Sequence, residues 1–383
     1  MPLSLLKHTS SQQKQHMHKR TFLKTSGILA AATLAKHSFA FNISKNRKPD
    51  DMIIGHGNYK YKVKKDWAKM SIERNPLLNC HEMVMDSKGR LIMIGDHTNN
   101  NILVFDKSGK LLDYWGTQYP GGHGLSLSKE GGEDFLFITD CGYYVDRNGE
   151  WKKQAGEVFK TDLTGKIIIN FPNPRTIGVY KDDELFMPTE TAIAPNGDIY
   201  VADGYGSDYI IQYNQKGEYI RHFGGHKNTN PGHNLDNAHG VVIDNRNEKN
   251  PVLMCTSRND NEFKYFTLEG KYLKTVSLPG LFVCRPVIDD KNIYAGVCWS
   301  TTKEGKKWQK DTGFITVLDA NNKVVSNPGG TEPKYVNGAL QQMFQSEEKV
   351  FNHGHDVCVD EDKNLYVCQW NASHTPPVKL ERV

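Results

Sequence analysis

The sequence predicts an all-β protein, a six-bladed β-propeller, and three observations lead to this fold class. A short apolar run recurs six times along the 383 residues, and histidine is its first residue in four of the six. In most units a polar turn and a second β-rich run follow, as in a hairpin. The units recur about every 40 to 70 residues, a spacing typical of four-stranded propeller blades. The six runs are His81–Asp86, His123–Ser128, Thr189–Ala194, His239–Asp244, Cys284–Asp289 and His355–Asp360.

The third unit shows the strands of a blade most clearly. After its first run, the pattern predicts strands over Ile199–Ala202, Tyr209–Tyr213 and Glu218–Phe223. Polar turns that contain glycine separate these strands. The first unit repeats the arrangement over Leu91–Ile94, Ile102–Phe105 and Leu111–Trp115.

The sixth unit supplies only three of the four strands that a blade needs. Its second strand is Leu365–Cys368 and its third falls within Val378–Val383. The alternating segment Tyr59–Val63, ahead of the first unit, is the candidate for the missing strand. Its pairing with the last strand would remove an open sheet edge. We therefore expect one domain, residues 59–383, closed by this N-terminal strand.

Residues 1–40 have the features of an export signal. A basic segment, Lys19–Lys24, precedes a moderately apolar stretch, Thr25–Ala35, and the small-residue segment Ser38–Ala40. The basic segment resembles a twin-arginine signal with lysine in place of the first arginine, and an ordinary secretory leader is the alternative. The apolar stretch is too short to span a membrane. We expect cleavage at the end of this segment, a linker over residues 41–58, and a periplasmic or otherwise extracytoplasmic protein.

Composition limits the classes of function. The formal charge of +4 comes from 48 basic and 44 acidic residues, and basic residues are enriched before residue 50. The propeller itself is therefore close to neutral or slightly acidic, which argues against a nucleic-acid partner. The seven cysteines include no C-x-x-C pair, so a cysteine zinc site is not indicated. We expect a monomer without a membrane span that acts on a small molecule, a peptide or a sugar derivative.

The histidines at the starts of the runs form a candidate metal site. The innermost strand of each propeller blade starts near the central axis, so residues at equivalent positions face one another. His123, His239 and His355 belong to the second, fourth and sixth units and therefore converge from three sides. Three imidazoles with an open axial position suit a catalytic zinc or a similar divalent metal. His81, from the first unit, could be a fourth ligand, a proton carrier or a substrate contact, and hydrated histidines that merely line the tunnel are the alternative.

Four segments carry a family resemblance: Met187–Tyr205, His222–Gly225, Ala238–Asp244 and Thr256–Arg258. On these residues the chain resembles the NHL-repeat propellers and, within them, peptidyl-α-hydroxyglycine α-amidating lyase, the zinc lyase that finishes peptide amidation. The resemblance covers roughly residues 75–383. Its generic parts fit any NHL propeller. Its specific parts are the three histidines, Asp-Gly-Tyr at 203–205 and Ser-Arg at 257–258.

The resemblance implies roles for individual residues. It places zinc ligands at His123, His239 and His355, the catalytic tyrosine at Tyr205 and an active-site arginine at Arg258. Zinc would lower the pKa of a bound hydroxyl group, a tyrosinate could take the proton, and the arginine would hold a carboxylate. His81 would border the same cavity. From the residues alone, Tyr205 could equally be a packed aromatic residue at a turn.

The resemblance also implies a structural calcium ion in the tunnel. Its ligands would be the backbone carbonyls of Met83 and Leu125 and the carboxylate of Asp356. Strand alternation turns Asp356 away from the ring of His355, so the residues alone leave it free for a salt bridge or a second cation site.

The chain departs from the family pattern at several positions. A second arginine expected after the second strand of the first blade is absent, and Asp96 and His97 occupy that place. Gly206 replaces the cysteine that follows the family's tyrosine, so the family's disulfide cannot form here. His81 and His353 are histidines that the family pattern lacks. The three metal-site histidines are retained, whereas the substrate is left open.

Three functions compete at this point. The first is a metal-dependent lyase of the amidating-lyase type, acting on a small substrate with a hydroxyl group and a carboxylate or on a sugar derivative. The second is a calcium-dependent lactonase or other sugar-acid hydrolase, which would need a metal site dominated by carboxylates. The third is a non-catalytic binding propeller. The predominance of histidine in the register favours the first.

Overall fold

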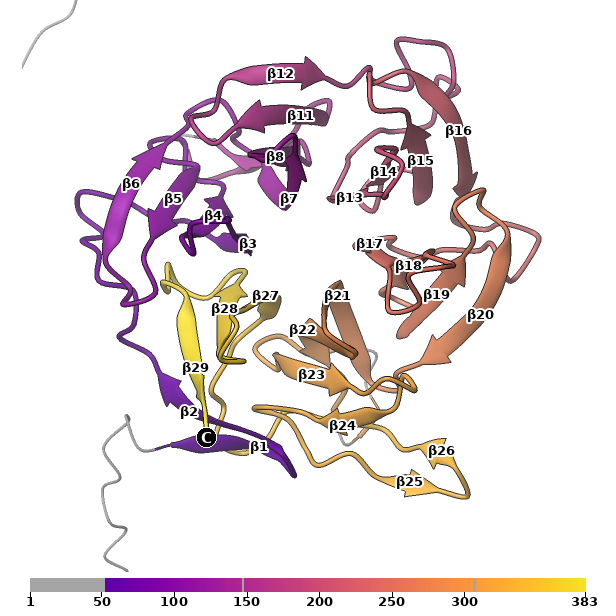
Figure 1. The fold of residues 1–383 in the computed structure, drawn as a ribbon. Coiled ribbons are helices and arrows are strands. Elements are labelled where there is room, and N and C mark those ends of the chain that lie inside the picture. The colour runs from indigo at the N-terminus through magenta and orange to yellow at the C-terminus, as the bar shows by residue number, and fades with distance from the viewer. Residues whose placement is uncertain (1–51, 147, 303, 306–307) are drawn as a thin grey trace, which may run out of the picture. The chain divides into compact units, whose positions relative to one another are not determined.

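The computed structural model describes residues 52–146, 148–302, 304–305 and 308–383 (Figure 1). These residues belong to one compact unit, Arg47–Val383, and the predicted export signal lies outside the described residues. Six β-sheets are arranged around a ring, and the part of the chain described contains no helix. The predicted all-β, six-bladed propeller is confirmed. No helix long and apolar enough to cross a membrane is found in these described ranges.

Each blade is an antiparallel sheet, and its strands follow one another in order from the central axis outward. The strands of blades 1 to 3 are β3 (Cys80–Met85), β4 (Leu91–Gly95), β5 (Ile102–Phe105), β6 (Leu111–Trp115); β7 (Gly122–Glu130), β8 (Glu133–Asp140), β11 (Glu157–Asp162), β12 (Ile167–Asn170); and β13 (Glu190–Ile193), β14 (Ile199–Ala202), β15 (Tyr209–Tyr213), β16 (Tyr219–Gly224). Those of blades 4 to 6 are β17 (Val241–Asp244), β18 (Val252–Ser257), β19 (Glu262–Phe266), β20 (Tyr272–Ser277); β21 (Leu281–Asp289), β22 (Asn292–Ser300), β23 (Phe314–Leu318), β24 (Val324–Ser326); and β27 (Gly354–Val359), β28 (Leu365–Gln369), β29 (Val378–Arg382), with β2 (Tyr59–Lys64) and β1 (Ile53–His56).

Equivalent turns recur because the same short-range chemistry recurs. Gly109 closes the turn between β5 and β6 with φ +85°, and Gly217 closes the matching turn of blade 3 with φ +82°. Only glycine adopts this left-handed conformation without strain. The side chain of Asp106 accepts a hydrogen bond from the Ser108 amide at 2.9 Å, and Asn214 supports its own turn in the same manner. The hairpin register is thus set locally in each unit.

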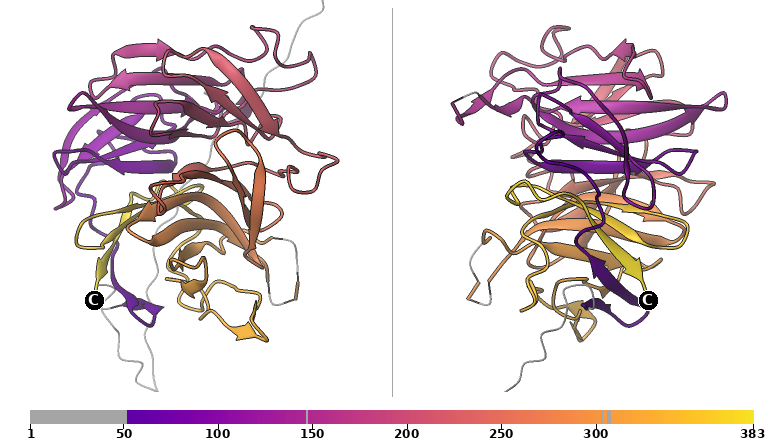
Figure 2. Two further views of the ribbon diagram at one scale, coloured as in Figure 1. Left: turned by 45° about the vertical axis from the view of Figure 1, so that its right-hand side comes forward. Right: turned by 90° about the vertical axis from the view of Figure 1, so that its left-hand side faces the viewer.

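The core lies between neighbouring blades. Strands β4, β14, β23 and β28 are buried along their whole length, whereas the outermost strands β6, β12 and β20 are largely exposed. One apolar cluster joins Ile92 and Ile94 of blade 1 to Leu136 and Ile138 of blade 2, and similar clusters join the other blades. The sheets thus pack face to face around the axis, and Figure 2 shows them stacked beside one another in two further views.

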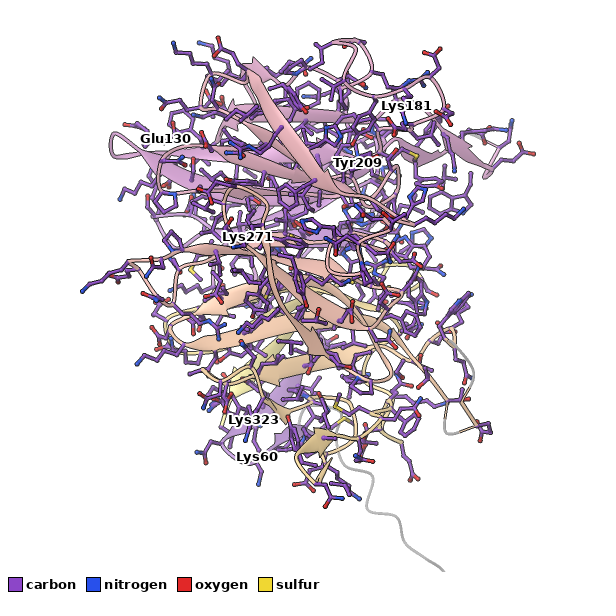
Figure 3. All side chains as sticks on the ribbon, turned by 90° about the vertical axis from the view of Figure 1, so that its right-hand side faces the viewer. Lys60, Glu130, Lys181, Tyr209, Lys271 and Lys323 are labelled. Atoms are coloured by element: carbon purple, nitrogen blue, oxygen red, sulfur yellow. The ribbon has the colours of Figure 1, made fainter. Side chains whose placement is uncertain are left out.

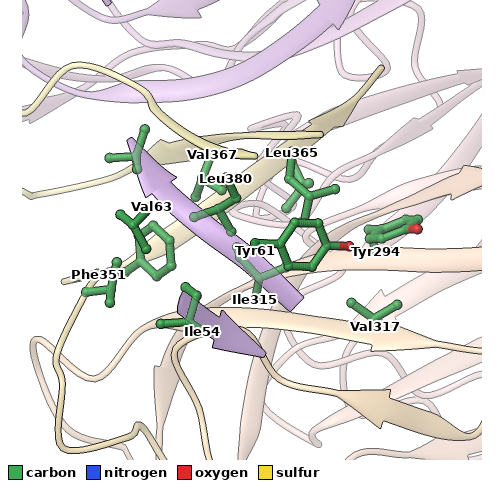
Figure 4. Packing of buried hydrophobic residues seen from close by; sticks show 13 residues of the cluster. Ile54, Tyr61, Val63, Tyr294, Ile315, Val317, Phe351, Leu365, Val367 and Leu380 are labelled. Atoms are coloured by element: carbon green, nitrogen blue, oxygen red, sulfur yellow. The ribbon is translucent and has the colours of Figure 1, made fainter. Parts of the chain in front are cut away.

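Blade 6 takes strands from both ends of the described chain. Strand β2 pairs antiparallel with β29, with Tyr61 opposite Arg382 and Val63 opposite Leu380. Tyr61 and Val63 are buried among residues of blades 5 and 6 (Figure 4). The segment expected as the closing strand therefore supplies the fourth strand of this blade. The stretch expected to be linker, in contrast, includes β1, because Ile53–His56 extends the sheet by pairing with β2.

Two small hairpins interrupt the blades. Strands β9 (Tyr143–Val145) and β10 (Trp151–Lys153) lie between β8 and β11, and β25 (Tyr335–Val336) and β26 (Ala339–Leu340) lie between β24 and β27. The β9–β10 hairpin projects from one face of the ring (Figure 2). Charged side chains such as Lys60, Lys271 and Lys323 are exposed on the outside (Figure 3). The two hairpins are separate from the six blades, and the inner strands of the blades surround the axis.

Candidate functional site

Four buried histidines meet at the axis. The ring centroid of His123 lies 4.8 Å from that of His239 and 4.9 Å from that of His355, and His239 and His355 are 4.9 Å apart. His81 lies 4.7 Å from His123 and 5.0 Å from His355. The structure thus brings together the three histidines predicted to bind a metal and places His81 beside them.

Local backbone irregularities aim these side chains. The pairing register shifts at His81 in β3, at His123 in β7 and at His355 in β27, so each is the extra residue of a β-bulge. A bulge re-aims a side chain relative to the regular alternation of the strand. Gly124 follows His123, and a Cβ atom there would lie 2.5 Å from the carbonyl oxygen of Thr189. Glycine therefore lets the inner strands approach closely enough for the imidazoles to touch.

The hydrogen bonds of the imidazoles leave nitrogen lone pairs available. The Nδ1–H of His123 donates to the Thr189 carbonyl at 2.8 Å, and that of His355 donates to the His81 carbonyl at 2.9 Å. The Nε2 atom of His355 and the Nδ1 atoms of His239 and His81 are buried without a partner among the described residues. Unpartnered buried polar atoms are rare and costly in folded proteins. A bound cation would satisfy them.

Burial also keeps the three predicted ligands neutral. Desolvation is the main cause that lowers the pKa values of His123, His239 and His355 well below the ordinary histidine range. Neighbouring imidazoles and the Arg258 guanidinium lower them further. Neutral imidazole is the form that binds metal ions. The donors present therefore fit a divalent transition metal such as zinc.

The side chains closest to one another form two overlapping groups of possible ligands. In one, the ligand atoms of His81, His123 and His355 all lie within 4.8 Å of each other, and in the other so do those of His239, Cys284 and His355. The three predicted ligands are thus divided between the groups, with His355 common to both. His81 has a second contact, because its Nε2 atom lies 3.2 Å from a carboxylate oxygen of Asp96. That carboxylate can orient the ring of His81.

Cys284 is a candidate ligand that the sequence argument did not single out. Its Sγ atom lies 3.1 Å from the Nη2 atom of Arg258. Burial alone would raise the pKa of the Cys284 thiol, but a hydrogen bond with Cys298 and the charge of Arg258 lower it. The sequence does contain a signal for this role, because Cys284 is the first residue of the fifth apolar run and so occupies the same position as the histidines of other runs.

Tyr205 lies between two of the histidines. Its hydroxyl oxygen is 3.2 Å from Nε2 of His123 and 3.1 Å from Nε2 of His239. A buried carboxylate, Asp203, shapes the turn by accepting hydrogen bonds from the amides of Met187 at 2.6 Å and Ser207 at 2.8 Å. Burial raises the pKa of the Tyr205 hydroxyl, so the tyrosinate expected there is not the form that the protein alone favours.

Arg258 is a buried cation beside the histidines. Its Nε atom donates to the Val283 carbonyl at 3.3 Å, and its guanidinium lies 5.4 Å from the ring centroid of Trp299. No carboxylate pairs with it among the residues that the structure describes. An arginine stays charged in proteins, and a buried charge calls for a partner. A guanidinium without a carboxylate partner can bind an anionic group, and the role that the resemblance implies for Arg258 stays a prediction.

Some of these groups line a cavity of about 390 Å³, whereas His239, His355 and Cys284 are not among its lining residues. His81, His123, Tyr205 and Arg258 border it, and its remaining wall is mainly aromatic. A second space, of about 900 Å³, is lined by Arg285 and by residues farther along the inner strands. The layer of side chains around Arg285 therefore lies between the two.

Arg285 corrects the expectation of a structural calcium ion. Its guanidinium donates to the carbonyls of Leu125 at 2.8 Å and Met83 at 3.2 Å, and to both carboxylate oxygens of Asp356 at 3.0 and 2.6 Å. These are the groups expected to bind calcium. The cation at this position is thus the protein's own side chain.

Two further buried carboxyl groups complete the layer. Glu82 lies 3.4 Å from Nη1 of Arg285, and Glu190 lies 3.5 Å from its Nε atom. Burial raises the pKa values of both glutamates, that of Glu82 strongly, so the layer holds fewer negative charges than it has carboxyl groups. Because the carboxylates of the tunnel already surround a guanidinium, they do not form the carboxylate-dominated metal site that a calcium-dependent lactonase would need.

The departures from the family pattern also have places in the structure. Asp96 pairs with His81, and the neighbouring His97 is partly exposed. A Cβ atom at Gly206 would lie 2.2 Å from a carboxylate oxygen of Asp203, so no larger residue fits this turn. His353 lies outside the histidine cluster, accepts a hydrogen bond from the Asp311 amide at 3.0 Å, and packs against aromatic residues of the cavity wall.

Comparisons with known proteins agree with this fold. No family model matches the chain. A probable peptidyl-α-hydroxyglycine α-amidating lyase of Caenorhabditis elegans is 30% identical over 129 residues, which are 32% of this chain and 31% of that protein. The chain thus matches about a third of the length of this curated relative. A gluconolactonase structure from Xanthomonas campestris has a TM-score of 0.51 at 11% identity, covering 85% of this chain and 90% of that chain.

A streptogramin B lyase structure has a TM-score of 0.49 at 13% identity, covering 84% of this chain and 97% of that chain. The similarity to an amidating lyase, predicted from the sequence, is confirmed for a third of the chain. Together with the ring of six blades, it supports the resemblance to NHL-repeat propellers that the sequence suggested.

Proposed function

We propose that this protein is a metal-dependent lyase that acts on a small substrate carrying a hydroxyl group next to a carboxylate. The observation that carries the proposal is the contact of the Tyr205 hydroxyl with the imidazoles of His123 and His239, beside a cavity that Tyr205, His123 and Arg258 all border, Arg258 having no carboxylate partner among the described residues. The imidazoles would hold a metal that ionises the substrate hydroxyl group, Tyr205 would exchange a proton, and Arg258 would bind the carboxylate. The partial similarity to a protein named as an amidating lyase supports the same reaction class.

The imidazoles of His123, His239 and His355 would hold the metal, with zinc the ion that suits these donors, and His81 or Cys284 lies close enough to join them. A metal bound there would supply positive charge that favours the ionised form of a hydroxyl group. The protein supplies the remaining functions. The Arg258 guanidinium would donate hydrogen bonds to the substrate carboxylate and fix its orientation.

Tyr205 would exchange the proton of the reaction. Its hydroxyl group lies between two imidazoles, at the place that the substrate hydroxyl would reach. For a substrate of the carbinolamide type, the hydroxyl group loses its proton, its oxygen becomes a carbonyl, the carbon–nitrogen bond breaks and the nitrogen takes up a proton. The products are an amide and an aldehyde acid, and no oxidant or reductant is consumed.

The test is product release from a model carbinolamide, N-benzoyl-α-hydroxyglycine. We expect the metal-loaded protein to release benzamide and glyoxylate, and the Tyr205→Phe and Arg258→Lys variants to release them at least about 100-fold more slowly. Removal of the metal with a chelator should abolish release, and added zinc should restore it. A protein that contains no stoichiometric transition metal and releases no product would instead be a binding propeller.

A further inference from the structure

The wall of the cavity is rich in tryptophan. Four of the six tryptophans of the chain line this one cavity, namely Trp151, Trp299, Trp308 and Trp370. They come from different parts of the chain, from strand β10, strand β22 and the segments that follow β22 and β28. A blade strand, an inserted hairpin and two connecting segments thus bring the same kind of side chain to one cavity.

Trp299 is at the centre of this aromatic wall. Its ring centroid lies 5.5 Å from that of Trp308, 5.8 Å from that of Trp370 and 6.5 Å from that of Phe282. These separations are typical of interacting aromatic pairs. His353, a departure from the family pattern, packs against both Trp299 and Trp370 at 6.1 and 5.5 Å. The inner part of the wall is therefore fixed before a ligand arrives.

The outer part of the wall is exposed although it is apolar. Trp151 is 54% exposed and Trp308 is 56% exposed, and both border the cavity. Covering a large aromatic side chain with a ligand removes apolar surface from water, which is favourable. Exposed apolar surface at a cavity is a feature of ligand sites. These two rings are thus available to contact an apolar part of a ligand.

The wall continues directly from the anion-binding group. The guanidinium of Arg258 lies over the ring of Trp299 at 5.4 Å from its centroid. A ligand whose carboxylate binds Arg258 therefore has Trp299 beside its next atoms. The tryptophan rings offer only their indole N–H groups for hydrogen bonds, so a polyhydroxyl group placed against them would leave hydroxyls without partners, although Asp96, Asn237 and Asn259 also belong to the lining.

We propose that the cavity selects α-hydroxy acids whose substituent on the hydroxyl-bearing carbon carries an aromatic or similarly flat apolar group, as the acyl group of an aromatic carbinolamide does. The inference rests on the proposed function for the orientation of the hydroxyl group and the carboxylate, and it adds the substrate class. The flat group stacks on the tryptophan wall, the carboxylate binds Arg258 and the hydroxyl group faces Tyr205.

The experiment is calorimetric binding to the full-length, metal-loaded protein, with three probes that share a hydroxyl group and a carboxylate. Mandelate carries an aromatic ring, lactate a methyl group and gluconate a polyhydroxyl chain. We expect mandelate to bind at least about 10-fold more tightly than lactate, and gluconate no more tightly than lactate. Equal affinities for mandelate and lactate, or tighter binding of gluconate than of mandelate, would overturn the proposal.

Variants test whether Trp151 and Trp308 cause the preference for mandelate. Trp151→Ala and Trp308→Ala should each weaken mandelate binding by about 2- to 12-fold and leave lactate binding unchanged, since the energy of one aromatic contact corresponds to that range. Both rings are exposed, so their loss should not unfold the protein. Tyr114→Ala, an exposed aromatic residue of β6 away from the cavity, is the matched control and should alter neither affinity. An equal loss for lactate would contradict a role of the wall in selectivity.

The binding result separates this inference from the proposed function. Preference for mandelate without release of benzamide from the model carbinolamide would support the aromatic wall and contradict the lyase. Release of benzamide without preference for mandelate would do the reverse.

Discussion

Single residues decide what the tunnel of this propeller contains. His123, His239 and His355 lie almost equally far from one another, and burial keeps their pKa values well below the usual range. A second layer, around Arg285, is filled by the protein's own cation. The two layers therefore differ in what they can bind: the first offers lone pairs to a metal, whereas the second already has its charge partner.

Replacement of His239 by alanine should remove the metal without unfolding the ring. The blades are held together by apolar clusters between sheets, not by this one side chain. We expect the metal affinity to fall by more than about 10-fold, because losing even a residue that only supports a ligand costs about 10- to 100-fold, and the metal content measured by elemental analysis to fall with it, while the circular dichroism spectrum is retained. His222→Asn, on the outer strand β16, is the control and should keep its metal. A variant that retained full metal content would contradict the assigned ligands.

Replacement of Arg285 by methionine should destabilise the protein and make it sensitive to calcium. The variant would leave Asp356, Glu82 and Glu190 buried without their cation, and the loss of one partner from a buried ionic group costs about 3–5 kcal/mol. Calcium should then raise the melting temperature of the variant but not that of the wild type. Denaturant and thermal unfolding with and without calcium check both points. Equal stabilisation of the wild type by calcium would contradict the view that Arg285 fills this position.

At the scale of elements, the turn after β14 positions Tyr205. It is fixed by the buried Asp203 and by the absence of a side chain at Gly206. A Cβ atom at position 206 would lie 2.2 Å from Asp203 Oδ1 and 2.4 Å from the Leu185 carbonyl oxygen. Both neighbours are buried or belong to the backbone, so neither can move without disturbing the turn.

Gly206→Ala should therefore displace Tyr205. We expect a loss of about 1–3 kcal/mol in the free energy of unfolding, the range for overpacking, and slower product release with the metal still bound. Gly178→Asn is the control, because Gly178 has φ +73° and open space around it, and asparagine tolerates this conformation. Unchanged kinetics in Gly206→Ala would mean that the turn has more room than the structure shows.

The end of β8 gives a pH-dependent test. Asp140 accepts hydrogen bonds from the amides of Gly121 at 3.0 Å and Gly142 at 2.8 Å, close to His123. Burial raises the pKa of the Asp140 carboxyl group from 3.8 to about 6. A raised carboxyl pKa means that the folded state binds the proton more tightly, so this contribution to stability is present at pH 4 and is lost as pH rises through 6.

Asp140→Asn should remove this pH dependence. The free energy of unfolding of the variant, relative to the wild type, should rise by up to about 3 kcal/mol between pH 4 and pH 6.5. Any constant effect of the amide on hydrogen bonding cancels in this comparison. Urea unfolding at several pH values is the measurement, and the exposed-turn variant Asp146→Asn should show no such change over the same range. A flat difference for Asp140→Asn would contradict the raised pKa.

At the scale of the whole propeller, the N-terminal pair of strands completes the last blade. Strand β2 supplies buried side chains to a cluster that reaches blade 5, and the hydroxyl group of Tyr61 accepts a hydrogen bond from Arg382 at 3.0 Å. We predict that the pairing of β2 with β29 contributes to the stability of the ring.

Deletion of residues 52–64 should lower both stability and solubility, because β29 would become an exposed edge strand. Truncation of one fully buried side chain, in Tyr61→Ala, should by itself cost about 3–5 kcal/mol. Ile53→Ala, which changes an exposed residue of β1, is the control. Thermal unfolding and light scattering are the measurements. A deletion variant as stable and soluble as the wild type would show that the ring does not depend on β2.

The sequence by itself determined the fold and the candidate metal ligands. The alternation of apolar residues and the turns with Asp, Asn and Gly act over a few residues, so the strands β5, β14 and β15 have the bounds predicted from the pattern. The equivalence of the units then placed His123, His239 and His355 around one axis, because repeated units in a closed ring present equivalent positions to the centre.

Only the tertiary structure decided what else reaches the axis. Arg285 is 160 residues from Leu125 and 202 from Met83, and nothing in the local pattern shows that its side chain would take the place of a calcium ion between them. The tryptophan wall likewise joins β10, β22 and the segments after β22 and β28, which the repeat does not relate to one another. Long side chains and insertions are placed by the packing of the closed ring, and their contacts depend on distances that exist only after the blades have assembled.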